Sequence, residues 1–244
     1  LIMSSVLVTG ANRGIGLGLA KELLKRNDVG LVFATTRAGS DDKELRAIKD
    51  ERLHVVEMDV SDDRSVALAA DKVREKVGEA GLDVLINNAG VFVKYDLEGS
   101  VIRKDLLKQL DVNSAGPLIV AQNFLEILKR AGQGPKKMSK LITISSMWGS
   151  IANNAGSYGK NAIAYNMSKA AVNMMTKTLS VDWKDYGIVP VSLCPGWVQT
   201  DMGGASAAIT AEESASALIS SIMDKITAQH SGGFYNRTLN IIPY

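Results

Sequence analysis

Short apolar runs rich in β-branched residues alternate along the chain with longer amphipathic stretches. The short runs predict strands at residues 5–9, 31–36, 54–58, 84–87, 140–145, 189–194 and 233–236. The longer stretches predict helices at residues 15–25, 42–50, 63–77, 103–130, 164–186 and 211–227. Regular alternation of strand and helix is typical of a parallel sheet with helices on both faces. The pattern therefore predicts an α/β fold, a doubly wound parallel β-sheet that forms a single domain over residues 1–244.

Composition narrows the functional classes. A length of 244 residues with 46% hydrophobic residues suits one large globular domain. A net charge of +2 gives no bias toward nucleic acid or acidic membranes. One cysteine, Cys194, and two histidines provide neither a disulfide framework nor a metal cluster. No apolar run has the length of a membrane span and no signal peptide is evident, so we expect a cytoplasmic protein that binds no metal, nucleic acid or membrane.

Tyr165 and Lys169 carry the most informative chemistry. They lie four residues apart in a predicted helix, so both side chains share one face. A lysine cation beside a phenol favours the phenolate, so we expect Lys169 to lower the pKa of Tyr165 from about 10 toward neutrality. Such a phenol serves as a general acid toward a carbonyl or as a general base toward an alcohol. Because such pairs also arise by chance on helix surfaces, this one gains weight only from the other motifs.

A glycine-rich segment at residues 9–16, Thr-Gly-Ala-Asn-Arg-Gly-Ile-Gly, follows the first predicted strand and opens the first predicted helix. Glycines let the backbone approach a pyrophosphate closely, and a helix N-terminus supplies N–H groups and a favourable dipole. The spacing is Gly-x-x-x-Gly-x-Gly and not the Gly-x-Gly-x-x-Gly of other dinucleotide-binding folds. We interpret the segment as a dinucleotide-phosphate turn, with a tight turn that binds no ligand as the alternative.

The end of the second predicted strand bears on the choice of dinucleotide. An acid usually stands there and binds the ribose 2′-hydroxyl, but this strand ends at Arg37, and Asp41 and Asp42 come too late. Arg13, inside the glycine-rich segment, adds a second cation. Two guanidinium groups near this position favour a 2′-phosphate, so the predicted cofactor is NADP(H). The alternative is that Arg37 merely begins a solvated loop.

Further motifs follow in order: Asp59-Val60 after the third strand, Asn87-Asn88-Ala89-Gly90 at the fourth, and Pro195-Gly196 with Val198 and Thr200 after the sixth. With the glycine-rich segment they resemble the short-chain dehydrogenases/reductases, a Rossmann-type family, over nearly the whole chain. Within that family, residues 6–19, 110–113 and 194–200 are similar to the sniffer-like carbonyl reductases and the C-factor proteins. The resemblance implies cofactor contacts by Gly10, Asn12, Arg13, Gly14, Ile15, Gly16, Arg37, Asp59, Val60, Asn87, Ala89, Gly90, Tyr165, Lys169, Pro195, Gly196, Val198 and Thr200.

The same resemblance implies four catalytic residues, Asn113, Ser146, Tyr165 and Lys169. As hydride reaches a carbonyl carbon, negative charge grows on the oxygen, to which Ser146 donates a hydrogen bond and Tyr165 a proton. Lys169 would lower the tyrosine pKa and hold the nicotinamide ribose. Asn113 would hold a water that connects Lys169 with solvent. Simpler roles remain open, with Ser146 as a turn cap and Asn113 as a structural side chain bonded to the backbone.

These residues predict an NADPH-dependent carbonyl reductase that acts on small-molecule aldehydes, ketones or quinones. One alternative is an NAD(P)-dependent alcohol or hydroxysteroid dehydrogenase. Another is a cofactor-sensing signalling protein on the same fold. The resemblance also implies a homodimer or tetramer formed through the predicted helices at residues 103–130 and 164–186.

Two segments near the expected site depart from the family pattern. The stretch between Ser146 and Tyr165 is longer than usual, and residues 152–160 read as a flexible loop at the mouth of the site. The stretch 201–210 is short and rich in small residues, where many relatives carry a longer lid. We therefore expect an open site with loose substrate selection.

Overall fold

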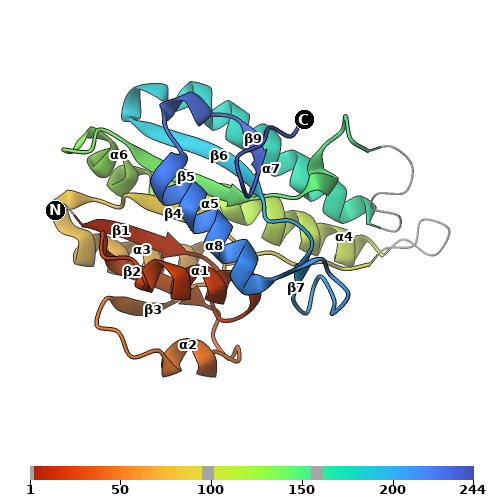
Figure 1. The fold of residues 1–244 in the computed structure, drawn as a ribbon, viewed down its shortest axis with the longest axis horizontal. Coiled ribbons are helices and arrows are strands. Elements are labelled where there is room, and N and C mark those ends of the chain that lie inside the picture. The colour runs from red at the N-terminus through yellow and green to blue at the C-terminus, as the bar shows by residue number, and fades with distance from the viewer. Residues whose placement is uncertain (1–2, 95–101, 155–161) are drawn as a thin grey trace.

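A seven-stranded parallel sheet forms the centre of the molecule, in the order β3-β2-β1-β4-β5-β6-β9 (Figure 1). The computed structural model describes residues 3–94, 102–154 and 162–244. The sheet strands are β1 Ser4–Val8, β2 Val29–Thr36, β3 Leu53–Glu57, β4 Val84–Asn87, β5 Ser139–Ile144, β6 Ile188–Cys194 and β9 Phe234–Asn236. Two short parallel strands, β7 (Val198–Gln199) and β8 (Ile209–Thr210), form a separate pair. The predicted α/β class and doubly wound parallel sheet are confirmed.

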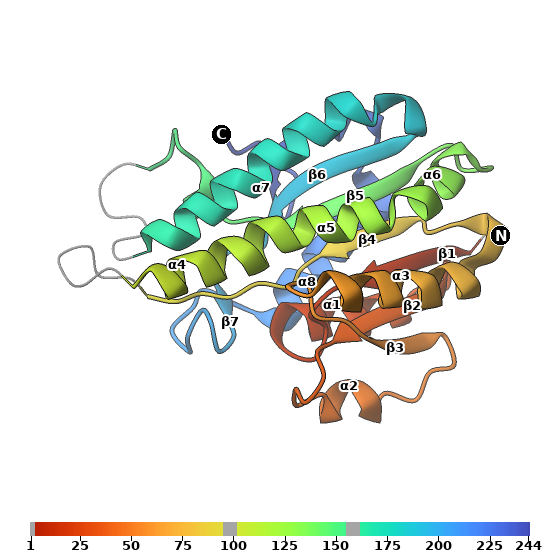
Figure 2. The ribbon, with the colours of Figure 1, turned by 180° about the vertical axis from the view of Figure 1, so that it is seen from behind.

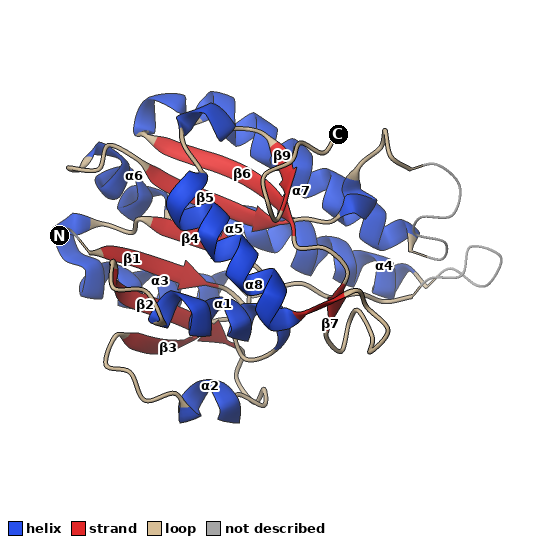
Figure 3. Ribbon diagram, in the orientation of Figure 1, coloured by secondary structure: helices blue, strands red, loops and turns tan. Residues whose placement is uncertain are grey.

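Helices cover both faces of the sheet (Figure 3). Helices α1 and α8 lie on the face seen in Figure 1, and α3, α4, α5 and α7 lie on the face seen in Figure 2. The helices are α1 Gly14–Leu24, α2 Lys43–Ala47, α3 Asp63–Val77, α4 Arg103–Leu110, α5 Gly116–Asn123, α6 Leu125–Gln133, α7 Ile163–Asp182 and α8 Ala211–Ser220. The strand order reverses between β1 and β4, and ligands of such sheets bind where the order reverses, at the carboxyl ends of the strands.

The alternation of side chains along each strand builds two cores. In β1, Val6 and Val8 pack with Leu19 of α1 on one face, whereas Leu7 packs with Val73 of α3 on the other. All five side chains are fully buried. Each contributes about 1.5–3 kcal/mol to folding by leaving water. Because both faces are covered, the strands read as continuous apolar runs, which is why the sequence located them well.

The stretch predicted as one helix over residues 103–130 is instead divided into three. A π-turn at Asp111–Ala115 separates α4 from α5, and Phe124 separates α5 from α6. Pro117 lies in the first turn of α5. Proline has no N–H to donate to the carbonyl four residues earlier, which here belongs to Asn113. The π-turn therefore has a cause in the sequence, and it lies at a predicted catalytic residue.

Two other predicted helices are shorter than expected. Residues 42–50 give only α2, because Ile48 adopts an extended conformation after one turn. Residues 211–227 give α8, which continues into a π-turn at Ser221–Lys225 and ends at Ile226, whose backbone is extended. In both places the chain turns back toward the sheet. These boundaries depend on packing that a local pattern does not contain.

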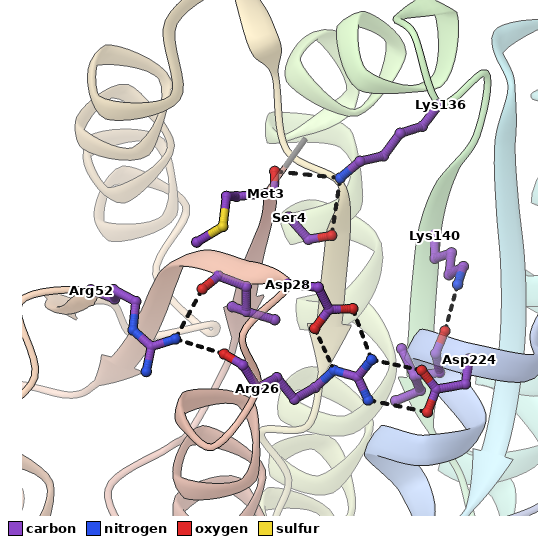
Figure 4. Close-up of polar contacts among 10 residues, drawn as sticks. Met3, Ser4, Arg26, Asp28, Arg52, Lys136, Lys140 and Asp224 are labelled. Atoms are coloured by element: carbon purple, nitrogen blue, oxygen red, sulfur yellow. Dashed lines mark hydrogen bonds and ion pairs between the residues drawn. The ribbon is translucent and has the colours of Figure 1, made fainter. Parts of the chain in front are cut away.

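A polar network joins elements at the amino edge of the sheet, away from the carboxyl ends (Figure 4). The Arg26 guanidinium bridges Asp28 and Asp224, with nitrogen–oxygen distances of 2.8 and 2.6 Å. The ammonium of Lys140 donates to the Ile222 carbonyl, and burial lowers the pKa of this lysine. Since Asp224 and Ile222 lie in the turn after α8, these contacts attach that helix to the loop after α1 and to β5.

Candidate active site

The glycine-rich turn between β1 and α1 can be built only from glycine at its key positions. Gly10 and Gly14 have φ values of +63° and +54°, a region that favours glycine. A Cβ atom on Gly16 would lie 2.3 Å from the Gly10 carbonyl oxygen. Among the residues that the structure describes, no side chain caps helix α1 at Arg13, which leaves the N–H groups of its first turn for a ligand. The turn therefore presents backbone donors and a helix dipole, as a phosphate group requires.

The turn is fixed by the neighbouring strand ends. The Thr9 hydroxyl accepts hydrogen bonds from the backbone N–H groups of Asn88 and Ala89, at 3.0 and 2.9 Å. The Asn88 amide donates to the carbonyls of Thr9 and Gly10. Ala11 N–H donates to the Thr35 carbonyl. The motif after β4 thus orients the glycine turn through Thr9 and Asn88, which belong to the predicted motifs but were given no role of their own.

The two predicted 2′-phosphate ligands differ in their surroundings. Arg37 follows β2 directly, is exposed, and forms no ion pair with any residue that the structure describes. Arg13 is exposed as well, but its guanidinium contacts the Asp201 carboxylate at 2.7 Å. Asn12 donates to the Asp41 carbonyl. Arg37 is therefore free to meet a phosphate, whereas Arg13 already has an anionic partner.

The adenine end of the predicted site lies after β3. The Asp59 carboxylate accepts hydrogen bonds from the backbone N–H and the hydroxyl of Ser61, at 3.0 and 2.7 Å. Val60 is buried, and its carbonyl lies so close to Gly116 that a Cβ atom there would approach it to 2.9 Å. The Asp59-Val60 pair is thus held rigidly between β3 and the start of α5.

Tyr165 and Lys169 lie on one face of α7, as predicted. The Lys169 ammonium lies 5.5 Å from the centre of the Tyr165 ring and donates a hydrogen bond of 2.8 Å to the Ile144 carbonyl at the end of β5. Ser146, two residues beyond that strand end, accepts from the Trp148 N–H at 3.2 Å and also hydrogen-bonds the Tyr165 phenol. The structure brings these three predicted catalytic side chains together.

The expected lowering of the tyrosine pKa is wrong for the protein without its ligands. Burial raises the pKa of Tyr165 to about 12, although the hydrogen bond from Ser146 opposes this shift. Burial also lowers the pKa of Lys169 to about 8, because desolvation disfavours the ammonium. Sequence spacing places the two groups together but contains no information on burial, which dominates here. At neutral pH the phenol therefore carries its proton, as a proton donor must.

Asn113 occupies the π-turn, and its side chain is fully used by neighbouring groups. Its Oδ1 atom accepts from the Val91 N–H, and its Nδ2 atom donates to the Val91 carbonyl, both at 2.8 Å. Nδ2 also donates to the Ser168 hydroxyl at 3.1 Å. This side chain fixes the segment after β4 against α7, as in the structural role left open for Asn113, and the water expected at this residue stays a prediction. Pro117 has no N–H to donate to the main-chain carbonyl of Asn113.

Two aromatic rings contact Tyr165 edge-on. The Phe92 and Trp148 ring centres lie 5.4 and 5.9 Å from that of Tyr165, with interplanar angles of 88° and 90°. Phe92 and Trp148 also contact each other. Edge-to-face pairs of this kind fix ring orientation. Phe92 was missed from the sequence, and its place two residues after Gly90 was the available signal.

The segment after β6 completes the carboxyl edge. The Pro195 carbonyl accepts from the Ser214 hydroxyl of α8, and Gly196 has a φ of +91°. Val198 is buried in β7, and the Thr200 methyl lies beside Gly14, where a Cβ atom would come within 3.2 Å. The segment thus reaches the glycine turn at Thr200, and its expected contact with the nicotinamide stays a prediction.

The structure describes only part of the two segments that depart from the family pattern, residues 152–160 and 201–210. Strands β7 and β8 close residues 201–210 into a small loop, and the indole N–H of Trp197 donates to the Gly203 carbonyl. The Trp197 side chain remains 57% exposed. The expectation of a short lid is consistent with this loop. Most of the loop expected at residues 152–160 lies outside the described residues.

The residues present fit a dinucleotide. Gly10 and Gly14 take the positive φ values that the turn requires, and the first turn of α1 offers uncapped N–H groups. Buried polar atoms without a partner among the described residues lie at the carboxyl ends of two strands flanking this turn, namely Thr36 Oγ1 and Asn87 Oδ1. Such atoms are expected where a ligand completes the hydrogen bonding.

Two other features, a membrane-spanning helix and a metal-binding cluster, are not found within the described ranges. No helix there has both the length and the hydrophobicity to cross a bilayer. No group of three or more His, Cys, Asp or Glu side chains in the same ranges is arranged to hold a metal ion.

Comparison with solved structures reveals close similarity of fold. Sniffer of Caenorhabditis elegans is 40% identical with a TM-score of 0.89, and the comparison covers 100% of both chains. The carbonyl reductase Sniffer of Drosophila melanogaster is 35% identical with a TM-score of 0.93, over 99% of this chain and 100% of the other. The NADPH-bound carbonyl reductase from chicken fatty liver is 36% identical with a TM-score of 0.92, over 100% of this chain and 95% of the other.

Comparison of sequences identifies the family to which the chain belongs. C-signal of Myxococcus xanthus is 36% identical over 163 residues, which are 67% of this chain and 93% of that protein. Estradiol 17-beta-dehydrogenase 2 of Mus musculus is 36% identical over 148 residues, but the match spans only 37% of its length. The family model described as short chain dehydrogenase matches residues 4–210. The chain therefore belongs to the short-chain dehydrogenase family, and its fold is similar to that of sniffer-like carbonyl reductases.

Proposed function

We propose that this oxidoreductase is an NADPH-dependent carbonyl reductase that converts aldehydes and ketones to alcohols, or quinones to hydroquinones. The observation that carries the proposal is the convergence of Ser146, Tyr165 and Lys169 at the carboxyl edge of the sheet, beside the glycine turn. The similarity to the NADPH-bound chicken carbonyl reductase supports both the reaction and the cofactor.

Each side chain has a distinct task in this reaction. The bound nicotinamide supplies the hydride. The Tyr165 phenol, protonated at neutral pH, donates the proton to the carbonyl oxygen, and Ser146 stabilises the charge that grows there. Lys169, with a pKa of about 8, is mostly cationic at pH 7 and favours the phenolate that remains after proton transfer. The main-chain carbonyl of Asn113 is the group proposed to bind a water that returns a proton to Lys169.

Arg37 supports the choice of NADPH over NADH. Its guanidinium follows β2, where the ribose 2′ position is expected, and no described acid neutralises it. A fork of N–H donors matches a phosphate in shape and charge. We expect Arg37→Gln to weaken NADPH binding and to leave NADH binding unchanged. Equal affinity of the wild-type protein for both cofactors would contradict this assignment.

Tyr165→Phe tests the reaction itself. It removes the phenolic oxygen and keeps the ring that packs against Phe92 and Trp148. Loss of the general acid should lower kcat by about 100-fold or more, while the dissociation constant of NADPH stays near that of wild type. Absorbance at 340 nm follows turnover with quinones, diketones and aromatic aldehydes, and NADPH fluorescence follows binding. Turnover in the variant at the wild-type rate would refute the proposed mechanism.

A second candidate is a dehydrogenase that works mainly in oxidation, and the match to estradiol 17-beta-dehydrogenase 2 favours it. The same side chains would serve, with Tyr165 as the base. Cofactor preference separates the two functions, because cells keep NADP mostly reduced and NAD mostly oxidised. A preference for NAD(H) in competitive binding would support the oxidative function and would also contradict the role of Arg37.

We also propose that the protein associates with itself through helices α4 and α7. The outer surfaces of α4 and α7 expose apolar side chains, with Leu107 50% and Met174 and Val181 each 66% exposed. Association through these helices would cover them. Light scattering should then give the mass of a dimer or tetramer, and a monomer at all concentrations would contradict this part alone.

A further inference from the structure

Two side-chain amides hold the segment that follows β4, which runs beside α4 (Figure 2). Asn113 exchanges two hydrogen bonds with the backbone of Val91. Gln109, to which no motif assigned a role, does the same at Val93. Its Oε1 atom accepts from the Val93 N–H at 3.0 Å, and its Nε2 atom donates to the Val93 carbonyl at 3.1 Å. Each amide thus bonds its residue as the opposite residue of an antiparallel strand pair would.

The spacing of the two amides matches that of the residues they hold. Gln109 and Asn113 lie four residues apart in one helical stretch, which corresponds to a rise of about 6 Å. Val91 and Val93 lie two residues apart, which corresponds to about 6.6 Å in an extended chain. Both ends of the short segment are therefore held at once. The residue between them, Phe92, has its Cα position and the direction of its Cβ atom fixed in consequence.

Gln109 is fully buried, with 0% of its surface exposed. A buried amide costs free energy unless its polar atoms are hydrogen-bonded. Here both atoms bond to the backbone of one residue, Val93. An apolar side chain of similar size would fill the same space without needing those bonds. The specific effect of the amide is therefore to hold Val93, and with it Phe92.

Phe92 contacts the proposed proton donor. Its ring meets the Tyr165 ring edge-on at 5.4 Å and also contacts Trp148, which meets Tyr165 from another element. An edge-to-face contact favours one orientation of each ring. A general acid acts only when its proton lies within hydrogen-bond reach of the substrate oxygen, and a displacement of about 1 Å can lower the rate about 100-fold. The placement of Phe92 therefore bears on turnover.

We propose that Gln109 is a positioning residue that holds Phe92 against Tyr165 through the Val93 backbone and so keeps the phenol in place for proton transfer. Gln109 is not a catalytic residue, because it acts through Phe92. This inference rests on the proposed function, in which Tyr165 donates the proton. It assigns to Gln109 a task that neither the motifs nor the spacing of the predicted catalytic residues indicated.

Two single variants and their combination test the proposal. Gln109→Met keeps the length of the side chain and removes both hydrogen bonds to Val93, whereas Phe92→Leu removes the ring that contacts Tyr165. Each should lower kcat about tenfold and leave KM and the dissociation constant of NADPH near their wild-type values. Because Gln109 acts through Phe92, the double variant should be no slower than Phe92→Leu alone. The loss should be equal for quinones, aromatic aldehydes and short aliphatic aldehydes, since one acid serves them all.

Near-ultraviolet circular dichroism gives a readout that needs neither substrate nor cofactor. Aromatic rings in fixed packing give a near-ultraviolet signal that disappears when the packing is lost. Gln109→Met should change this signal in the same direction as Phe92→Leu. Ser139→Ala is the control, because the fully buried Ser139 hydroxyl donates to the Leu128 carbonyl at 2.9 Å, at the amino end of β5. It should lower Tm and leave kcat and the spectrum unchanged.

Three results would overturn the proposal. If Gln109→Met lowers Tm but leaves kcat and the spectrum at wild-type values, Gln109 has only a structural role. If the losses in the double variant multiply, Gln109 acts by a route other than Phe92. If Phe92→Leu slows only aromatic substrates, the ring contacts the substrate and does not place the acid. A wild-type protein that reduces no carbonyl would contradict the proposed function and the catalytic part of this inference, whereas the spectra would still decide whether Gln109 holds Phe92.

Discussion

Replacing Asn113 by alanine tests whether this predicted catalytic residue acts mainly by holding the site together. The side chain is 1% exposed and makes three hydrogen bonds, two to the Val91 backbone and one to the Ser168 hydroxyl. Alanine leaves the Val91 N–H and carbonyl without partners. The Ser168 hydroxyl loses only the hydrogen bond that it accepts from Asn113 and still donates to the Tyr165 carbonyl, so this third lost contact costs little free energy.

The magnitude follows from the two orphaned backbone groups. Each buried group that loses its partner costs about 1–3 kcal/mol, and Val91 is only half-buried, so the lower part of that range applies. The expected loss in the free energy of unfolding is about 2–4 kcal/mol. For a protein of this size, each kcal/mol lowers Tm by about 2–4 °C, which gives a fall of about 4–16 °C. Turnover should fall as well, because the segment fixed by Asn113 carries Phe92, which contacts Tyr165.

Thermal unfolding by circular dichroism measures the effect. Asn123→Ala is the matched control, because the Asn123 amide donates within its own helix, to the Ile119 carbonyl, and is partly exposed. Its loss should cost less than about 1 kcal/mol. If Asn113→Ala and Asn123→Ala lower Tm equally, the structural role derived from the Val91 contacts is refuted.

Three further predictions concern neighbouring groups. The pKa of Lys169 is about 8 in the folded protein against 10.5 ordinarily, so the unfolded chain binds more protons between these values and stability rises with pH across that window. Urea unfolding at pH 7 should therefore show Lys169→Met to be more stable than wild type by about 3–4 kcal/mol, an advantage that is lost by pH 10.5. Lys177→Met, on the exposed face, should show no such advantage. Gly16→Ala should abolish NADPH binding in fluorescence titration, because its Cβ would lie 2.3 Å from a carbonyl oxygen; binding at wild-type affinity would contradict the geometry. Trp148→Leu should lower kcat/KM for aromatic carbonyls about three- to tenfold more than for short aliphatic aldehydes, and equal losses would argue against contact between Trp148 and the substrate.

The sequence predicted the sheet and most of the site because both depend on local signals. Buried parallel strands read as apolar runs, so the fourth strand was placed at its observed bounds, Val84–Asn87. The glycine turn is likewise local, because Gly10 and Gly14 adopt conformations that few other residues tolerate. The spacing of Tyr165 and Lys169 followed from the helical repeat alone.

What the sequence missed depends on contacts between distant segments. The pKa of Tyr165 is set by burial, which no spacing reveals. The hydrogen bonds of Asn113 to Val91, and the pairing of Arg13 with Asp201, join segments that no local pattern relates. The break before α5 was readable in principle, since Pro117 marks it.

The strand order has a consequence for how the protein is made. Strand β1 lies between β2 and β4, and Thr9 at its end bonds to Asn88 and Ala89 after β4, so the glycine turn takes its final form only after β4 has docked. The segment that carries Thr200 follows β6 in the chain, so it can reach its final position only after β6 has joined the sheet. Sheets assembled from such distant pairings fold slowly and expose apolar edges meanwhile. A dinucleotide that binds only the finished sheet stabilises it by mass action. We therefore expect the supply of cofactor in the cell to influence how much newly synthesised chain survives to become enzyme.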